Sequence, residues 1–436
     1  MDSFLTLNRN LNKLSYFWHM KSVNASIITI GDELLIGQVT DTNSGWIARQ
    51  LNSAGIAVTR RVAVGDNADE IRNSLDEEGE KANIILMTGG LGPTSDDITK
   101  KVLCEYFGGK MIVNEDALEN VKYLFEKVFK RPVTDVNLLQ GEVPDVCKVI
   151  QNRRGTAPGM VFTKEGKIYI SMPGIPYEME GMIEDSVIPL LKEKFELPVI
   201  IHRTMLTAGI GESALAEMIR DFENELPSEI KLAYLPTYGM VRLRLSTTGF
   251  DKQASEQKMD RYFKELKSLT AAYLVTDVDD PLPVVIGKIL KSKNKTISTA
   301  ESCTGGYIAY LITSVPGSSA YYEGSIISYS YKVKGTVLGV HENTLNTFGA
   351  VSEQTVIEML NGLLSCLNTE YGLAVSGIMG PDGGTEDKPV GTVWMAAGNK
   401  TEYKTQKINL RFNRKRNIEI TGMIALNFIR KFIVEH

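Results

Sequence analysis

From Ala25 onwards the chain alternates short apolar runs, typical of β-strands, with longer amphipathic runs, typical of helices. Parallel strands cannot be joined by a tight turn, so this order predicts right-handed crossovers and a largely parallel sheet. The expected strands lie at 25–30, 56–64 and 83–88, and the expected helices at 43–54, 68–81 and 98–106. The sequence therefore predicts an α/β fold that binds ligands beyond the carboxyl ends of its strands.

Three loops fall at that edge of the predicted sheet. Residues 31–35 (Gly-Asp-Glu-Leu-Leu) follow the first strand, residues 64–66 (Val-Gly-Asp) the second, and residues 88–99 (Thr-Gly-Gly-Leu-Gly-Pro-Thr-Ser-Asp-Asp-Ile-Thr) the third. A glycine-rich loop that leads into a helix suits a phosphate or pyrophosphate. The paired carboxylates of Asp96 and Asp97 would repel such an anion unless a divalent cation lies between them. The alternative is that both residues cap the following helix.

A further strand-to-helix junction occupies residues 300–306 (Ala-Glu-Ser-Cys-Thr-Gly-Gly), between a strand-like run at 295–299 and a helical run at 307–313. Ser302 would stand at the helix mouth, where unpaired N–H groups and the helix dipole favour a phosphate or a developing oxyanion. The alternative is that Ser302 only caps the helix. Cys303 competes as a nucleophile, since a thiolate is intrinsically more reactive, although a small buried apolar role also fits it.

The last third of the chain carries three more motifs, at 328–334 (Ser-Tyr-Ser-Tyr-Lys-Val-Lys), 376–384 (Ser-Gly-Ile-Met-Gly-Pro-Asp-Gly-Gly) and 388–393 (Lys-Pro-Val-Gly-Thr-Val). Together with residues 300–306 they closely resemble the C-terminal domain of the CinA family, the competence/damage-inducible proteins. The resemblance implies deamidation of nicotinamide mononucleotide without a cofactor. It places Ser302 at the position of the nucleophile, and Tyr329 and Lys334 at the positions of the residues that activate it.

Hydrolysis of a carboxamide requires a nucleophile, a group that moves its proton, and donors for the oxyanion. A Ser-Lys pair can meet the first two needs if the lysine is partly neutral, and Tyr329 could relay the proton or orient Lys334. Without the family, Tyr329 would be interpreted as a buried aromatic residue and Lys334 as a solvated surface charge. The four histidines lie outside the motifs, at His19, His202, His341 and His436.

The resemblance also implies which residues bind the substrate of the C-terminal site. The family usually has one arginine after a turn near residue 412, whereas this chain offers Arg414, Lys415 and Arg416, so the matching residue stays open. The expected set is Thr304, Gly305, Gly306, Ser376, Gly377, Gly380, Arg414 and Arg416.

The N-terminal loops resemble the molybdopterin-binding fold of MoaB, MogA and MoeA, and more closely the N-terminal domain of CinA proteins. Residues 152, 155–159 and 172–179 extend that resemblance. It implies cleavage of a dinucleotide pyrophosphate, usually ADP-ribose, with a divalent metal ion of the magnesium or cobalt type and a monovalent cation as a further candidate. We expect the metal at Asp66, Asp96 and Asp97. The expected substrate-binding residues are Gly31, Asp32, Glu33, Gly89, Gly90, Gly92, Thr94, Asn152, Gly155, Thr156, Pro173 and Gly174.

The middle of the chain has strand-like runs at 199–206 and 241–247 and helical runs at 213–223 and 253–268, which predict a small α+β module. In the family this region is KH-like. Residues 209–212 (Gly-Ile-Gly-Glu) are short and acidic for an RNA-binding loop, so we expect a spacer or dimerisation module. The expected division is an extension at 1–19, a MoaB/MogA-like domain at 20–180, a KH-like domain at 181–278 and a C-terminal α/β domain at 279–436.

The composition of the chain limits the classes of partner that it can bind. A net charge of −5 and a pI near 5.7 give no basic face for nucleic acid, and the one basic cluster, at 411–416, is a solvated helix start or a phosphate contact. Four scattered cysteines predict reduced thiols in a cytoplasmic protein, and no apolar run is long enough for a membrane span. The family implies small nucleotides as ligands and a homodimer. Residues 1–19 are expected to be poorly ordered, with Met20 competing with Met1 as the start.

Two classes of function follow. One is a bifunctional enzyme of pyridine nucleotide recycling. The other is a non-catalytic nucleotide- or pterin-binding scaffold in competence or recombination. The intact set of Ser302, Tyr329 and Lys334, together with the lack of a basic stripe, favours the enzyme.

Overall fold

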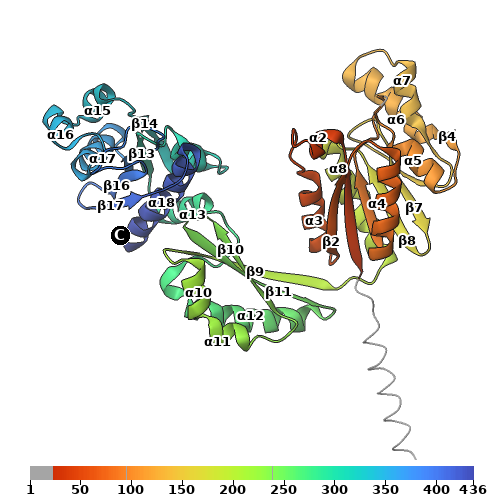
Figure 1. Cartoon of the computed structure of the whole chain (residues 1–436), viewed down its shortest axis with the longest axis horizontal. Helices are drawn as coiled ribbons and strands as arrows, with labels where there is room; N and C mark the ends of the chain where they lie inside the picture. The colour runs from red at the N-terminus through yellow and green to blue at the C-terminus, as the bar shows by residue number, and fades with distance from the viewer. Residues whose placement is uncertain (1–22, 95, 238) are drawn as a thin grey trace, which may run out of the picture. The chain divides into compact units, whose positions relative to one another are not determined.

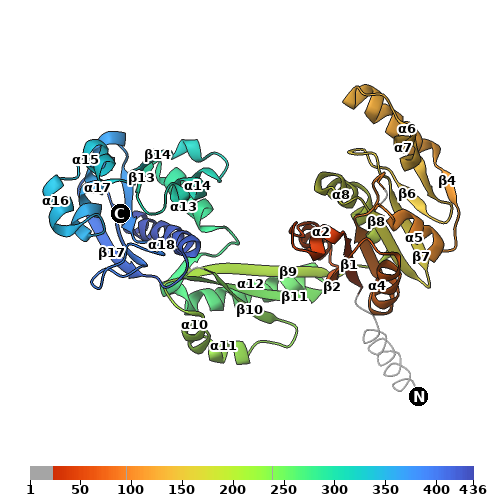
Figure 2. The same cartoon turned by 45° about the horizontal axis from the view of Figure 1, so that its top comes forward.

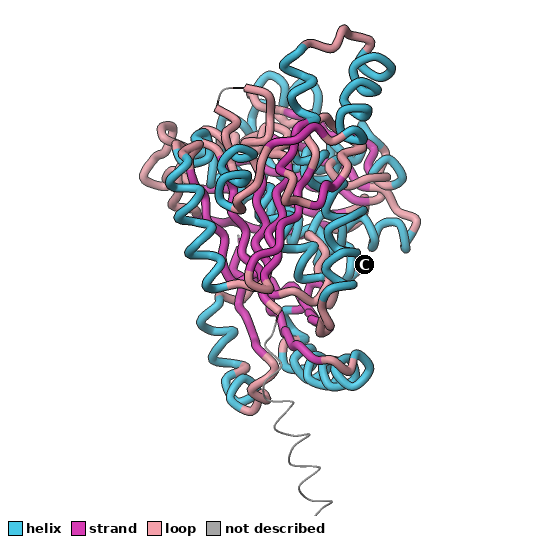
Figure 3. The backbone as a smooth tube through the Cα atoms, turned by 90° about the vertical axis from the view of Figure 1, so that its right-hand side faces the viewer, coloured by secondary structure: helices cyan, strands magenta, loops and turns pink. Residues whose placement is uncertain are grey.

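The computed structural model describes residues 23–94, 96–237 and 239–436. These residues form two compact units, one built from the chain up to residue 200 with 248–255, and the other from 201–247 with 256–436. Figure 1 follows the elements along the chain, and Figure 3 separates helices, strands and loops by colour. The extension expected at 1–19, and with it the choice between Met1 and Met20, lies outside the described residues.

A six-stranded sheet forms the centre of the N-terminal unit, in the order β2-β1-β3-β8-β7-β6. The first four strands in that order run parallel, as predicted, whereas β7 and β6 run antiparallel to their neighbours. The sequence had not indicated this antiparallel edge. The strands are β1 Asn24–Ile30, β2 Ala57–Val64, β3 Ile84–Thr88, β6 Lys148–Ile150, β7 Gly159–Lys164 and β8 Lys167–Met172.

Helices cover both faces of this sheet, because alternate residues of a central strand point to opposite sides. Ile27 packs in a core with α3, α8 and α9, whereas Ile28 packs in a second core with α4 and α5. The helices are α2 Asp32–Leu35, α3 Asn43–Ser53, α4 Ala68–Lys81, α5 Thr99–Tyr106, α8 Pro176–Met182, the π-helix Ile183–Val187 and α9 Ile188–Lys194. The domain boundary expected after residue 180 falls inside the last helical run, whose Ile183 is fully buried in the N-terminal core.

An insertion between α5 and β6 adds a small two-stranded sheet and short helices, and it brings Gln140 to the edge where the loops gather. Its elements are β4 Met111–Val113, α6 Glu115–Tyr123, the π-helix Leu124–Phe129, α7 Asp135–Leu138, the 3-10 helix Leu139–Gly141 and β5 Glu142–Pro144.

The middle module has a four-stranded sheet in the order β10-β11-β9-β12, with α10, α11 and α12 on one side of it (Figure 1). The helix expected at 213–223 is broken at Ile219, which leaves the helical conformation. The elements are β9 Val199–Ala208, α10 Glu212–Met218, α11 Arg220–Asn224, β10 Lys231–Thr237, β11 Met240–Gly249, α12 Lys252–Leu269, a 3-10 turn Ala271–Tyr273 and β12 Leu274–Thr276.

The C-terminal domain is a three-layer α/β fold around a five-stranded sheet in the order β14-β13-β15-β16-β17 (Figure 2). Here β13 runs parallel to β14 and β15, while β16 and β17 are antiparallel. One face packs against α13, α14 and α18, and the other against α15, α16 and α17. The strands are β13 Ile297–Glu301, β14 Tyr322–Ile327, β15 Tyr371–Gly377, β16 Thr392–Gly398 and β17 Tyr403–Asn409.

The C-terminal helices follow from apolar spacing. In α18, Leu426, Ile429 and Ile433 recur every three or four residues and are fully buried. No helix in the described ranges is long and apolar enough to cross a membrane. The helices are α13 Leu282–Lys293, α14 Tyr307–Thr313, the 3-10 turn Ser318–Ala320, α15 Tyr331–Leu338, α16 Glu342–Phe348, α17 Glu353–Leu367 and α18 Arg414–Glu435.

Candidate active sites

Ser302 lies in a turn between the end of β13 and the start of α14. Its backbone N–H donates to Val375 O at 3.0 Å, which fixes the turn to the neighbouring strand β15. The residue that caps α14 is Gly306, in the left-handed region at φ 99°, so Ser302 does not serve as the cap. The side chain of Ser302 is therefore available for chemistry.

Lys334 is fully buried and reaches the serine hydroxyl. Its Nζ lies 2.8 Å from Ser302 Oγ, 2.7 Å from Ser328 O and 3.2 Å from Tyr329 O. Burial lowers the pKa of Lys334 to about 8, because the charged ammonium loses its hydration. The interpretation of Lys334 as a solvated surface charge is wrong.

The contacts of this amine can be made in either protonation state. A neutral amine has two N–H donors and one lone pair, whereas the ammonium has three donors and no acceptor. As the ammonium, Lys334 donates to all three oxygens. As the neutral amine, it can keep its two N–H groups on Ser328 O and Tyr329 O and present its lone pair to the Ser302 hydroxyl. The arrangement can therefore take the serine proton.

The carboxylate of Glu301 occupies the first turn of α14. It is fully buried and accepts the N–H groups of Gly306, Ile308 and Ala309 at 3.1, 3.1 and 2.8 Å. The expectation that these N–H groups would bind a phosphate or an oxyanion is therefore wrong. β13 extends to Glu301, two residues beyond the expected strand, and so aims this carboxylate at the helix.

Two other N–H groups remain beside the nucleophile. The backbone N–H groups of Cys303 and Thr304 donate to no other backbone group among the described residues. Both directly follow Ser302, so they can donate to an oxyanion that forms on a carbonyl attacked by the serine. The hydroxyl of Thr304 is also buried without a partner in the described part of the chain.

Cys303 packs in the core of the C-terminal domain. It is 5% exposed, and an added Cβ on Gly377 would lie 3.1 Å from its sulfur. Burial raises the pKa of the Cys303 thiol to about 12, so the reactive thiolate is disfavoured. The structure thus supports the buried apolar role for this cysteine.

Tyr329 and Arg414 form the outer part of the site. Tyr329 is 62% exposed, and its hydroxyl accepts from Arg414 Nη2 at 3.1 Å. Lys334 bonds the carbonyl of Tyr329, not the hydroxyl, so no proton relay through the tyrosine ring is present in the described contacts. Arg414 also donates to Gly380 O at 2.8 Å, whereas Arg416 stacks over the Phe412 ring at 4.8 Å. Of the two arginines, Arg414 faces the site.

The remaining expected residues shape the backbone around the turn. Gly305 and Gly306 take positive φ angles of 59° and 99°, which glycine adopts without strain. The Ser376 hydroxyl donates to Ala350 O at 2.7 Å and is buried, so it supports the end of β15.

A cavity of about 350 Å³ opens in the N-terminal unit where the predicted loops meet. Gly89 allows this meeting, since an added Cβ would lie 2.1 Å from Ile30 O. Among the predicted site residues, those that line the cavity are Gly31, Glu33, Asp66, Gly89, Gly90, Gly92, Asp96, Asp97, Thr156, Pro173 and Gly174.

One wall of this cavity is acidic. Asp32 and Asp66 each accept the other's backbone N–H at 3.1 Å, which joins two of the loops. Burial raises the pKa of Asp66, and the negative charges of Asp32, Glu33 and Asp96 add to the rise. Asp97 Oδ2 accepts from the backbone N–H and hydroxyl of Thr94, at 3.0 and 2.5 Å, so it holds the loop and does not cap α5.

These oxygen donors suit a hard divalent cation. Within the described ranges, no three His, Cys, Asp or Glu side chains converge on one metal position. Magnesium is commonly held by one or two carboxylates together with waters and substrate phosphates, and Asp66 and its neighbours fit that mode.

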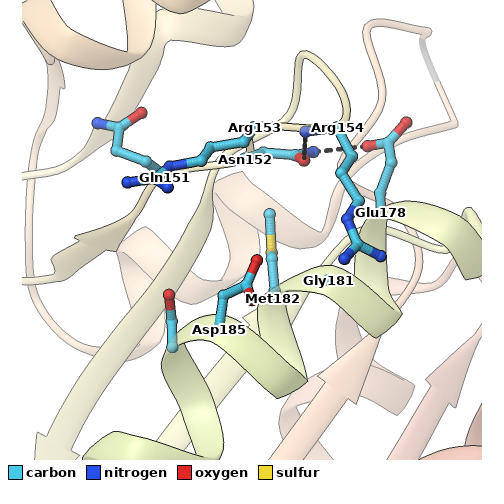
Figure 4. Close-up of a pocket in the computed structure, with 9 residues that line it drawn as sticks. Gln151, Asn152, Arg153, Arg154, Glu178, Gly181, Met182 and Asp185 are labelled. Carbon is cyan, nitrogen blue, oxygen red and sulfur yellow. Dashed lines mark hydrogen bonds between the residues drawn. The ribbon is translucent and has the colours of Figure 1, made fainter.

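The other four expected residues of this site are not among those that line the cavity. Asp32 and Thr94 are hydrogen-bonded to Asp66 and Asp97, respectively, whose carboxylates line the cavity. Asn152 and Gly155 lie against Glu178, a buried residue that does line it, and Figure 4 shows the Asn152 amide hydrogen-bonded to that carboxylate.

Comparison with known proteins identifies relatives that match nearly the full length of the chain. A CinA-like protein of Cytophaga hutchinsonii is 44% identical over 413 residues, which cover 95% of this chain and 99% of that protein. The chain belongs to the CinA family. A CinA-like protein of Flavobacterium psychrophilum is 45% identical over 415 residues, with the same two coverages. The solved structure of the protein CinA with unknown function from Thermoplasma acidophilum is 33% identical and covers 40% of this chain and 99% of its own, with a TM-score of 0.36.

Three family models match successive parts of this CinA-family chain. A probable molybdopterin binding domain matches residues 26–193, the damage-inducible protein CinA KH domain matches 202–275, and the CinA C-terminal domain matches 279–433. The predicted three-domain α/β architecture with a KH-like middle domain is confirmed.

Sequence reasoning missed three residues that organise the sites of this CinA-family protein. Glu301 holds the start of α14, and Glu178 lines the N-terminal cavity; both stood inside motifs that were already recognised. Asn417 is fully buried and donates to Met379 O and Phe412 O at 3.1 and 2.9 Å, which ties the start of α18 to the loop before Gly380. An asparagine on the core side of a helical first turn was the available signal.

Proposed function

We propose that this protein is a bifunctional hydrolase of pyridine nucleotides. The C-terminal domain hydrolyses nicotinamide mononucleotide to nicotinate mononucleotide and ammonia, and the N-terminal domain cleaves ADP-ribose-type pyrophosphates with a divalent metal ion. The observation that carries the proposal is the 2.8 Å contact between Ser302 Oγ and the buried Lys334 amine. The family resemblance supplies the substrates.

In the deamidase site, neutral Lys334 takes the hydroxyl proton as Ser302 Oγ bonds to the carboxamide carbon. The N–H groups of Cys303 and Thr304 hold the resulting oxyanion. Lys334 then gives the proton to the departing nitrogen, which leaves as ammonia, and an acyl-enzyme remains on Ser302. Water adds to this ester with Lys334 again as the base, and the nicotinate product is released.

In the pyrophosphatase site, the glycines at 89, 90 and 92 let the main chain approach a pyrophosphate closely. Asp66, with Asp96 and Asp97, would hold the divalent cation. When bound, the cation supplies positive charge that neutralises the phosphates against the acidic wall.

The contact between Ser302 and Lys334 argues against a non-catalytic scaffold. Burying an amine costs stability, so a buried lysine is a candidate for function, and the pair of Ser302 and Lys334 has the geometry of proton transfer. The ligands proposed are small nucleotides, and the four free cysteines suit a cytoplasmic enzyme. The homodimer stays a prediction, which light scattering on the purified protein would check.

The deciding experiment is to incubate the purified protein with nicotinamide mononucleotide and, separately, with ADP-ribose, each with and without magnesium or cobalt. Ammonia release and chromatography of the nucleotides report the two activities. If neither substrate is consumed under any condition, the bifunctional proposal is wrong.

A chelator should separate the two activities. EDTA should abolish ADP-ribose cleavage, because the acidic wall would then face an anionic substrate, and should leave deamidation largely intact, since backbone N–H groups hold that oxyanion. Asp66→Asn, which keeps the side-chain shape, should reproduce the loss in the presence of metal. Loss of both activities on chelation would contradict the assignment of metal to one site alone.

Alanine substitutions of the two arginines near the start of α18 should have very different effects on KM for nicotinamide mononucleotide. Arg414→Ala should raise KM for nicotinamide mononucleotide by about 10- to 100-fold, because a charge-assisted hydrogen bond to the substrate phosphate would be lost. Arg416→Ala should stay within about threefold of wild type, since its side chain stacks on Phe412 and substitutions at such surface positions usually have small effects. The reverse order, measured by steady-state kinetics, would mean that the wrong arginine has been assigned.

A further inference from the structure

One carboxyl group of the N-terminal cavity stands apart from the acidic wall. Glu178, on α8, lines the same cavity as Asp66 but is only 9% exposed. The carboxylates that raise the pKa of Asp66 are Asp32, Glu33 and Asp96, and Glu178 is not among them. Glu178 comes from α8, whereas the acidic residues of the cavity come from the loops that follow β1, β2 and β3.

The position of this carboxylate is fixed by its surroundings. Glu178 Oε2 accepts from Asn152 Nδ2 at 2.6 Å, and Asn152 is itself held by Ala157 O and the Arg154 N–H, both at 3.0 Å. Gly155 makes room for it, since an added Cβ would lie 2.0 Å from the carboxyl carbon of Glu178. The other oxygen, Oε1, has no protein donor in the described residues, and Figure 4 shows it pointing away from Asn152.

No cation neutralises Glu178 within the described ranges. The nearby Arg154 lies across α8 instead, where an added Cβ on Gly181 would meet its Nε at 2.4 Å. From there Arg154 bonds Tyr177 O at 3.3 Å and approaches Glu184 at 3.8 Å. The charged groups around Glu178 are Arg153, Arg154 and Asp185 on the side of the smaller pocket in Figure 4, and Glu33, Asp66, Asp96 and Asp97 around the main cavity.

These surroundings give Glu178 the properties of a base. Burial raises the pKa of Glu178, and the hydrogen bond from Asn152 partly opposes that rise. A carboxylate with a pKa nearer to neutral is a better proton acceptor at physiological pH. Carboxylates next to a bound cation are poorer acceptors, because the cation stabilises their charged form.

We propose that Glu178 is the general base of the pyrophosphate site. Its free oxygen takes a proton from the water whose oxygen bonds to one phosphorus, while the bond from that phosphorus to the bridging oxygen breaks. Two phosphate monoesters leave, and the proton passes from Glu178 to solvent. The acidic wall holds the cation, and Glu178 alone handles the proton. This role rests on the proposed pyrophosphatase function.

Kinetics of Glu178→Gln in the full-length protein with saturating magnesium test this role. The amide keeps the shape and can still accept from Asn152, but it cannot take a proton. We expect kcat for ADP-ribose to fall by about 100- to 10,000-fold with KM little changed. Glu180→Gln, on the same helix outside the cavity, is the matched control and should keep its kcat. Melting profiles that match the wild type, followed by circular dichroism, would show that the N-terminal unit of both variants is folded.

A second variant gives a readout that a structural role would not produce. Asn152→Ala removes the hydrogen bond that lowers the pKa of Glu178, so the acid limb of the pH profile of kcat/KM should move to higher pH. An acid limb that does not move, or a Glu178→Gln enzyme with near wild-type kcat or with only a raised KM, would overturn the role of Glu178 alone. A wild-type protein that cleaves no ADP-ribose would overturn the proposed pyrophosphatase function and this role with it.

Discussion

Replacing Ser302 by alanine should lower kcat for deamidation by about four to six orders of magnitude, because loss of a covalent nucleophile removes the acyl-enzyme route. The turn should survive, since its anchors are the backbone N–H of Ser302 and the carboxylate of Glu301, which the substitution leaves in place. Ammonia release in the steady state measures the loss. Unchanged ADP-ribose cleavage would show that the N-terminal unit is unaffected.

Cys303→Ala is the matched control for that experiment. The thiol is buried in the core with its pKa raised to about 12, so its removal should cost some stability and little activity. Thermal melting separates the two effects. If Cys303→Ala were the inactive variant and Ser302→Ala the active one, the nucleophile would be the cysteine.

Lys334→Met should lower deamidation by about 100- to 10,000-fold, since the apolar side chain fills the same buried volume but cannot take a proton. In the wild type, kcat/KM should rise about tenfold per pH unit below pH 8 and level off above it. The sign follows from the lowered pKa of about 8, because the reactive neutral amine accumulates as pH rises through that value.

Two further variants sharpen this prediction. Lys334→Arg keeps a cation that stays protonated, so it should be as inactive as Lys334→Met. Lys332→Met removes an exposed lysine from the same helix and should keep both the rate and the pH profile. A Lys334→Arg enzyme with near wild-type turnover would reduce Lys334 to a group that only binds the substrate.

Much of the fold could be predicted because it depends on local pattern. Strand β1 and helix α4 appear within a residue of their expected bounds, since an apolar run buried on both faces and an amphipathic run between caps leave few alternatives. The antiparallel strands β6 and β7 could not be predicted. Their pairing depends on a tight turn and on a distant edge of the sheet, and the hydrophobic periodicity of the sequence indicates neither.

In the candidate sites, too, some features could be predicted from the sequence and others depend on the packed structure. Ser302 and Lys334 were expected from their motifs, but the burial that turns the lysine into a base is a property of the packed domain. The choice between Arg414 and Arg416 depends on which side chain the helix start presents to Gly380 O, a matter of rotation that spacing leaves open. The role of Glu301 escaped notice because its partners are main-chain N–H groups, which leave no signature in a sequence.

The hydrogen bonds that orient Lys334 also determine which substitutions this site tolerates. The two groups that orient the amine are the carbonyls of Ser328 and Tyr329, and every amino acid supplies a carbonyl. The exposed side chain at position 329 can therefore vary without altering the direction of the lysine lone pair, whereas the side chain of Ser328 is fully buried. Substitutions at position 329, in evolution or in the laboratory, would change the choice of substrate, because the ring of Tyr329 is exposed. The proton-transfer step would stay intact.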